Sequence, residues 1–96
     1  MTITIDVTQS DIDNGICSAP GHCAVALACQ RTMPHAEDLC VYPIGGVEWC
    51  LAGGETRFRA PLPYHMRAWL DAFDDGRLVA PVSFQLEIES SEWVGP

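Results

Sequence analysis

The sequence predicts an α+β fold of two layers, in which helices pack on one face of a mainly antiparallel sheet. Two Gly-Gly pairs, Gly45-Gly46 and Gly53-Gly54, separate short runs in which polar and apolar residues alternate. A Gly-Gly pair between such runs is typical of a tight hairpin turn, because both central positions of that turn require a positive φ. A helical apolar stripe and a fully alternating run follow the hairpins. Since each segment is apolar on one side only, we expect one core between a helix layer and a sheet layer.

The first strand and the first helix are predicted over residues 2–7 and about 9–14. Polar and apolar residues alternate over residues 2–7, which places the two isoleucines and the valine on one face. The stretch from Thr8 to Asp11 resembles a capping box, in which the N-cap and the third helical residue satisfy each other's backbone N–H groups. Gly15 follows as a residue suited to end the helix.

A second helix is expected to begin near Ser18, with Pro20 in its first turn, and to end near Arg31 before Pro34. Alanine dominates this segment. Small side chains let a helix approach a sheet closely, so we expect this helix to lie directly on the sheet.

The two Gly-Gly turns predict a meander with strands over about 39–44, 47–52 and 55–60. The implied cross-strand pairs are Ile44 with Val47, Tyr42 with Trp49, Cys40 with Leu51, Trp49 with Phe58 and Glu48 with Arg59. One face then carries an aromatic row of Tyr42, Trp49 and Phe58, and the other face carries a charge pair. Pro43 in the first of these strands predicts that this strand lies at a sheet edge.

The last helix, expected over about 63–75, has the clearest pattern in the chain. Its apolar stripe consists of Leu62, Met66, Trp69, Leu70 and Phe73. Gly76 ends it, and a final strand over about 82–88 is expected to pair with the first strand. The order is therefore β-α-α-β-β-β-α-β, with one domain over 1–89 and a C-terminal tail over 90–96.

Composition excludes several classes of function. The 96 residues suffice for one domain, and the net charge is −8, with thirteen acidic residues against five basic ones. That charge disfavours binding to nucleic acid or to an anionic membrane, because both require clustered cations. The N-terminus has neither a basic region nor a long apolar run, so we expect a cytoplasmic protein.

Cysteines and histidines are the first candidates for a metal site or a nucleophile. Cys17, His22, Cys23, Cys29 and His35 fall within a short stretch, but none forms the close ligand pairs of structural zinc. Only Cys17 and either His22 or Cys23 could approach one metal ion, across the loop that precedes the predicted helix. A Cys–His nucleophile remains an alternative, although no family-specific local signature accompanies it. We expect reduced thiols, no metal and no cofactor.

Acidic side chains and an isolated apolar pair are the candidates for binding a partner. Asp71, Asp74 and Asp75 form a negative surface on the last helix, which suits a basic protein. Trp93 and Val94 stand in the otherwise polar tail, where tryptophan is a preferred interface anchor. The tail is therefore expected to dock on its own domain, on a second copy or on a partner.

Arg57 and Arg59 are the basis of an alternative function. They alternate on one face of a strand, and only Arg59 has a cross-strand acidic partner, because Arg57 faces Cys50 in the expected register. Paired guanidinium groups bind phosphate or carboxylate in a bidentate manner. The alternative is thus a binder of a small anionic metabolite or nucleotide.

Four segments resemble small, mostly uncharacterised proteins of actinobacterial phages. They are residues 5–15 (IDVTQSDIDNG), 23–28 (CAVALA), 69–76 (WLDAFDDG) and 81–87 (PVSFQLE). The resemblance implies a phage protein that works in the cytoplasm of a bacterial host and binds a host component, and it carries no catalytic residue. All five basic residues are arginine, which agrees with a GC-rich genome. We therefore expect a small acidic, non-enzymatic interaction protein.

Overall fold

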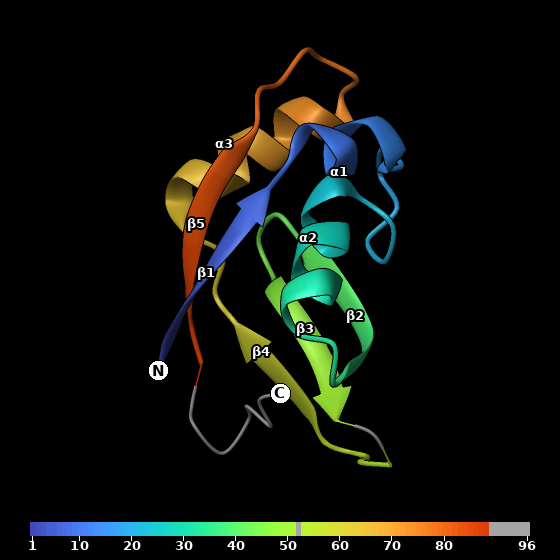
Figure 1. The fold of residues 1–96 in the computed structure, drawn as a ribbon, viewed down its shortest axis with the longest axis vertical. Helices are drawn as coiled ribbons and strands as arrows, with labels where there is room; N and C mark the ends of the chain where they lie inside the picture. The colour runs from blue at the N-terminus through green and yellow to red at the C-terminus, as the bar shows by residue number, and fades with distance from the viewer. Residues whose placement is uncertain (52, 89–96) are drawn as a thin grey trace.

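A computed structural model describes residues 1–51 and 53–88 and has the predicted α+β class and element order (Figure 1). In chain order the elements are β1 (Thr2–Val7), α1 (Gln9–Asn14), α2 (Ala24–Thr32), β2 (Ala36–Tyr42), β3 (Gly46–Leu51), β4 (Arg57–Ala60), α3 (Tyr64–Asp74) and β5 (Val82–Glu87). The boundary expected at residue 89 and the tail with Trp93 and Val94 lie outside the described residues.

The strands form two antiparallel sheets rather than one. β1 pairs with β5, as expected for the first and last strands, and the second sheet has the order β2-β3-β4. α2 contacts β1, β2 and α1, so it joins the two sheets (Figure 1). β2 lies at an edge of its sheet, which confirms the position predicted for it.

The capping box at the start of α1 is confirmed, and it is part of a larger junction. The Thr8 hydroxyl accepts from the Asp11 backbone N–H at 3.2 Å, and the Asp11 carboxylate accepts from the Thr8 backbone N–H at 2.9 Å. Arg31 of α2 donates to both Asp11 oxygens, at 2.7 and 2.9 Å, and to the Asp6 carbonyl at 2.9 Å. The Arg31 guanidinium therefore ties together α1 and α2 through a bidentate ion pair and β1 through a hydrogen bond.

The second helix begins later than the sequence suggests. α2 starts at Ala24 with Cys23 as its N-cap, whose sulfur accepts from the Ala26 backbone N–H at 3.4 Å. The expected start near Ser18 is wrong, because Ser18 has a φ of +58° and breaks the helix. The Pro20 carbonyl instead accepts from the Val41 backbone N–H of β2 at 2.9 Å.

Gly15 ends α1 for a different reason from the expected one. Its φ is −73°, so it does not need the left-handed conformation that favours glycine. A Cβ at this position would lie 2.6 Å from the backbone nitrogen of Ala24. The absence of a side chain therefore allows α1 and α2 to approach closely.

The register of the meander was predicted correctly for one hairpin and wrongly for the other. Between β3 and β4, Trp49 lies opposite Phe58 and Glu48 opposite Arg59, as expected. Between β2 and β3, Tyr42 pairs with Gly46 instead of Trp49, and a bulge lies between Glu37 and Cys40. The turn therefore consists of three residues, 43–45, instead of two. In the pair Gly45-Gly46, only Gly46, the first residue of β3, has a positive φ.

This shift removes Tyr42 from the predicted aromatic row. An odd displacement moves a side chain to the opposite face of its strand, and Tyr42 is 40% exposed. Trp49 is 1% exposed and its ring lies 6.2 Å from that of Phe58. The row therefore contains two rings and not three.

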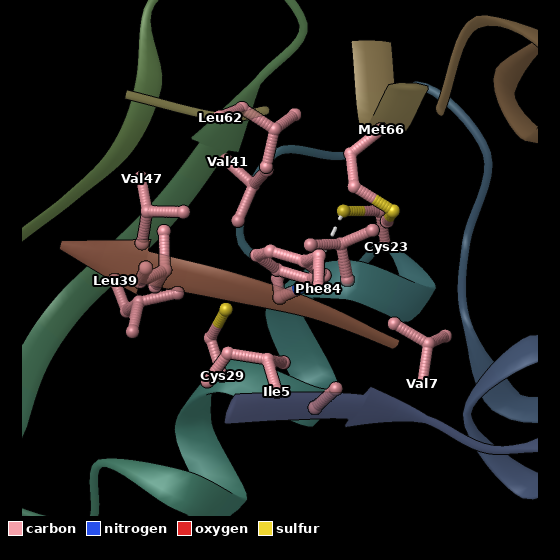
Figure 2. Packing of buried hydrophobic residues seen from close by; sticks show 14 of the residues in the cluster. Ile5, Val7, Cys23, Cys29, Leu39, Val41, Val47, Leu62, Met66 and Phe84 are labelled. Carbon is pink, nitrogen blue, oxygen red and sulfur yellow. Dashed lines mark hydrogen bonds between the residues drawn. The ribbon is translucent and has the colours of Figure 1, made fainter. Parts of the chain in front are cut away.

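The core contains side chains from both sheets, α2 and α3. Figure 2 shows Phe84 of β5 near Ile5 of β1, Val41 of β2 and Met66 of α3. The apolar stripe of α3 is buried as expected, except that Trp69 is only partly buried. The Trp69 ring stacks on the Phe73 ring, with their centroids 5.8 Å apart, and the Trp69 Nε1–H donates to the Ala80 carbonyl at 2.9 Å.

α3 is eleven residues long, and over residues 1–51 and 53–88 no helix is both long and apolar enough to span a bilayer.

Replacing Trp49 by alanine should destabilise the protein by about 3–5 kcal/mol, because a large buried ring leaves a cavity. Tyr42→Ala should cost below about 1 kcal/mol, since that side chain is substantially exposed. Chemical denaturation of both variants measures the difference. Equal losses would contradict the register between β2 and β3.

The Asp11–Arg31 pair should make stability depend on pH. The hydrogen bond from Arg31 holds the pKa of the buried Asp11 carboxyl below its ordinary value; burial opposes this shift, and hydrogen bonds from Thr8 add to it. Since the pKa of Asp11 is lower in the folded state, its contribution to stability is present above the unfolded value of about 4 and is lost as the pH falls below it. Asp11→Asn should reduce the acid-induced loss of stability and cost about 2–3 kcal/mol at pH 7. Chemical denaturation between pH 7 and 2 measures the free energy of unfolding of each variant, and Asp13→Asn at an exposed position is the control. If the free energy of unfolding of the wild type and of Asp11→Asn falls equally with pH, the pair does not cause the pH dependence.

A candidate protein-interaction groove

An apolar groove of ≈ 530 Å³ lies between the β2–β3 turn and α3. The residues that line it are Tyr42, Pro43, Ile44, Gly45, Tyr64, Arg67, Ala68 and Asp71. The first four belong to the end of β2 and the turn, and the others belong to α3. The groove therefore depends on the position of the turn relative to this helix.

Large apolar side chains are exposed around this groove. Ile44 is 87% exposed, Tyr64 is 83% exposed and Tyr42 is 40% exposed. Single exposed apolar residues are ordinary, but several around one concave surface are typical of an interaction site. Tyrosine is enriched at interfaces because its ring is apolar and its hydroxyl makes hydrogen bonds. The neighbouring Cys40 raises the pKa of Tyr42, so its phenol stays protonated at neutral pH.

Two charged side chains of α3 also line the groove. Arg67 and Asp71 are one helical turn apart, and no ion pair joins them. The Arg67 Nε atom is buried and has no hydrogen-bond partner within the described chain. Leaving a buried donor unsatisfied costs about 1–3 kcal/mol, more for a charged group. Because the Nε atom itself is buried, it is not open to a ligand in the groove.

The three aspartates expected to form one negative surface have different environments. Asp71 lines the groove. Asp74 accepts from the Ser18 backbone N–H at 2.9 Å, and Asp75 pairs with Arg77 at 3.4 Å. Only Asp71 is thus both at the groove and without an ion pair within the described chain.

The arginine face does not have the expected free guanidinium. Glu48 lies 3.7 Å from Arg57 and 3.4 Å from Arg59, and Arg57 also donates to the Asp38 carbonyl at 3.0 Å. The prediction that Arg57 is unpaired is therefore wrong, because the Glu48 side chain reaches both arginines.

A cavity of ≈ 610 Å³ beside Arg57 is lined by Gly21, His22, Gln30, Asp38, Leu39, Cys40, Tyr42, Glu48 and Arg57. Its lining contains two carboxylates and one guanidinium. This balance does not favour an anion, and anion binding through Arg57 and Arg59 stays a prediction.

The described thiols belong to no group of side chains that could hold a metal ion. Cys23 and Cys29 are buried, and burial raises the pKa of each, so both are protonated at neutral pH and poorly nucleophilic. Cys17 donates to the Phe73 carbonyl at 3.0 Å. All five thiols are free, and no group of three or more potential ligands is placed to hold a metal among residues 1–51 and 53–88.

Sequence reasoning missed Ile44 and Tyr64 as site residues. Ile44 was expected to lie in a strand opposite Val47, and it lies at the tip of a turn. Tyr64 lies outside the apolar stripe of α3, and this position is the signal that could have identified it as an exposed aromatic residue.

Gly46→Ala should destabilise the protein and disturb the groove, because Gly46 fixes the turn. Its φ is +85°, and a Cβ there would lie 2.4 Å from the Ala60 carbonyl oxygen of β4. A positive φ alone costs about 1–2 kcal/mol for a residue with a side chain. Gly53→Ala is the matched control, since its φ is +73° and nothing lies within 4 Å of the added Cβ. Thermal unfolding should show a clearly larger loss for Gly46→Ala; equal losses would contradict the close approach to β4.

Comparison with protein-family models, with curated proteins and with solved structures finds no match to this chain. The candidate site therefore rests on its own geometry.

Proposed function

We propose that this small acidic protein is a non-enzymatic interaction protein, which binds a bacterial host protein through the groove between the β2–β3 turn and α3. The observation that carries the proposal is the exposure of Ile44, Tyr64 and Tyr42 around that groove. Burying exposed apolar surface is the main favourable contribution to most protein association. Aromatic anchors near the centre of an interface supply much of its binding energy.

The net charge supports the choice of partner. At −8, the chain repels nucleic acid and anionic membranes and attracts basic proteins over long range. The resemblance to actinobacterial phage proteins supports a partner in the cytoplasm of a bacterial host. The groove has an apolar lining with two tyrosine hydroxyls, one guanidinium and one carboxylate, a composition typical of recognition surfaces.

Capture from an actinobacterial lysate tests the proposal. The bait proteins are the wild type, a double variant with Ile44→Ser and Tyr64→Ser, and the control Leu78→Ser. Leu78 is fully exposed and does not line this groove. A host protein enriched by the wild type and the control should be lost with the double variant, while all three melt at similar temperatures.

The captured protein is then purified and titrated with each bait. Loss of two anchors should weaken binding by about 2 kcal/mol or more, roughly thirtyfold in Kd. Undiminished binding by the folded double variant would contradict a role for the groove.

A further inference from the structure

We infer that the outer edge of β5 pairs with the same edge of a second copy, so that two chains form a symmetric dimer through one intermolecular sheet. β5 has β1 on one side, and the described residues place no strand on its other side (Figure 1). An unpaired strand edge presents backbone donors and acceptors to another chain. No groove-lining residue belongs to β5, so this inference is independent of the proposed function.

The bonds at the end of the sheet show which backbone groups of β5 point outward. The Met1 amino group donates to the Ile88 carbonyl at 2.6 Å, and the Ile88 N–H donates to the Met1 carbonyl at 2.8 Å. Antiparallel partners alternate between pairs that exchange both backbone bonds and pairs that exchange none. In the register of β1 and β5, the pairs that exchange none are Thr2 with Glu87, Thr4 with Gln85 and Asp6 with Ser83. The backbone N–H and C=O groups of Ser83, Gln85 and Glu87 therefore point away from β1.

Two side-chain bonds agree with this assignment. The Asp6 carbonyl accepts from the Arg31 guanidinium of α2 at 2.9 Å, so it points away from β5, as the alternation requires. The Ser83 hydroxyl donates to the Asp6 carboxylate at 2.5 Å, which fits the close approach of a pair without backbone bonds. The outer edge of β1 therefore lies beside α2. Within the described residues no other backbone bond reaches Ser83, Gln85 or Glu87, and all three are exposed.

The positions of the outward groups determine the register of the dimer. A two-fold axis must bring outward groups opposite outward groups, so it passes beside Ser83, Gln85 or Glu87. An axis at Ser83 brings Gln85 opposite Pro81, which has no N–H to donate. An axis at Glu87 places two carboxylates directly opposite each other, which is destabilising. The axis at Gln85 is therefore the favourable one.

Pairing about Gln85 satisfies the outward groups of all three residues. The two Gln85 residues face each other, and Ser83 of each copy faces Glu87 of the other. Each facing pair exchanges both backbone bonds. The Gln85 side-chain amides hold donors and acceptors and are able to bond to each other, and no charge of β5 faces a like charge. The result is a continuous sheet with the order β1-β5-β5-β1.

Sedimentation velocity of the full chain tests the dimer over a range of protein and salt concentrations. A strand edge buries less surface than a standard interface of roughly 1,600 Å², so the dimer is expected to be weak. Protein concentrations up to about 1 mM cover the corresponding Kd range. Each copy carries a net charge of −8, so the dimer should become tighter between about 0.05 and 0.5 M NaCl as salt screens the repulsion. A chain that is monomeric under all these conditions would overturn the inference.

Matched variants test the position of the axis. Gln85→Glu places like charges opposite each other at the axis and should weaken the dimer up to about fivefold. Thr4→Glu is the control, because Thr4 lies opposite Gln85 on the same exposed face and takes the same charge change away from the edge. Gln85→Pro removes the central donor of both copies and should weaken the dimer about tenfold or more. Melting temperatures verify folding; equal affinities of Gln85→Glu and Thr4→Glu would overturn the register.

A cysteine at the axis tests the register covalently. The two Gln85 Cα atoms should lie about 5.5 Å apart, a distance that a disulfide spans. Gln85→Cys should therefore form a covalent dimer on incubation with oxidised glutathione. Thr4→Cys should not, because three strand spacings, roughly 14 Å, separate Thr4 from its counterpart. The wild type shows the contribution of the five native thiols, and covalent dimers in both variants or in neither would overturn the register.

The double variant with Ile44→Ser and Tyr64→Ser separates this dimer from the groove. It should dimerise with the affinity of the wild type, because neither residue lies in β5. A dimer that is lost in this variant would assign self-association to the groove and overturn the inference. Loss of host-protein capture with an unchanged dimer supports both proposals, so each of them can fail without the other.

Discussion

The close packing of α2 against both sheets is the constraint on which the rest of the structure depends. The two sheets share no strand, and α2 contacts a strand of each. Ala24, Ala26 and Ala28 are fully buried, so the helix presents small side chains where bulkier ones would hold the strands apart. At the end of the helix, Arg31 reaches back to Asp11 and fixes α1 as well. A short alanine-rich segment thereby determines the relative position of most other elements.

The groove is a product of how one turn is accommodated. The three-residue turn and the bulge in β2 direct Tyr42 outward and place Ile44 at the turn tip. The backbone of Gly46 passes against the Ala60 carbonyl, and α3 begins four residues after that contact. The turn and the helix that form the two walls of the groove are therefore fixed to each other through β4.

Local signals predicted the elements whose partners are near in sequence or whose pattern is strong. The capping box of Thr8 and Asp11, the apolar stripe of α3 and the hairpin of Trp49 and Phe58 are of this kind. The start of α2 and the register of the first hairpin depend on contacts distant in sequence, such as the bond between Pro20 and Val41, so local patterns misplaced them. The site was harder still, because Ile44 and Tyr64 become neighbours of one groove only through tertiary structure.

The pairing of β1 with β5 has a consequence for how the chain acquires its structure. Thr2 lies opposite Glu87, and the Met1 amino group donates to the Ile88 carbonyl at 2.6 Å, across 87 positions of sequence. Among the described residues β1 pairs with no other strand, so its backbone N–H and C=O groups have no strand partner until β5 is available. During synthesis, the first strand must wait for nearly the whole described chain to leave the ribosome. Contacts this distant carry a large loop-closure entropy and are associated with slow folding. The apolar face of β1 is thus exposed for most of translation, a period in which a chaperone or a premature partner has access to it.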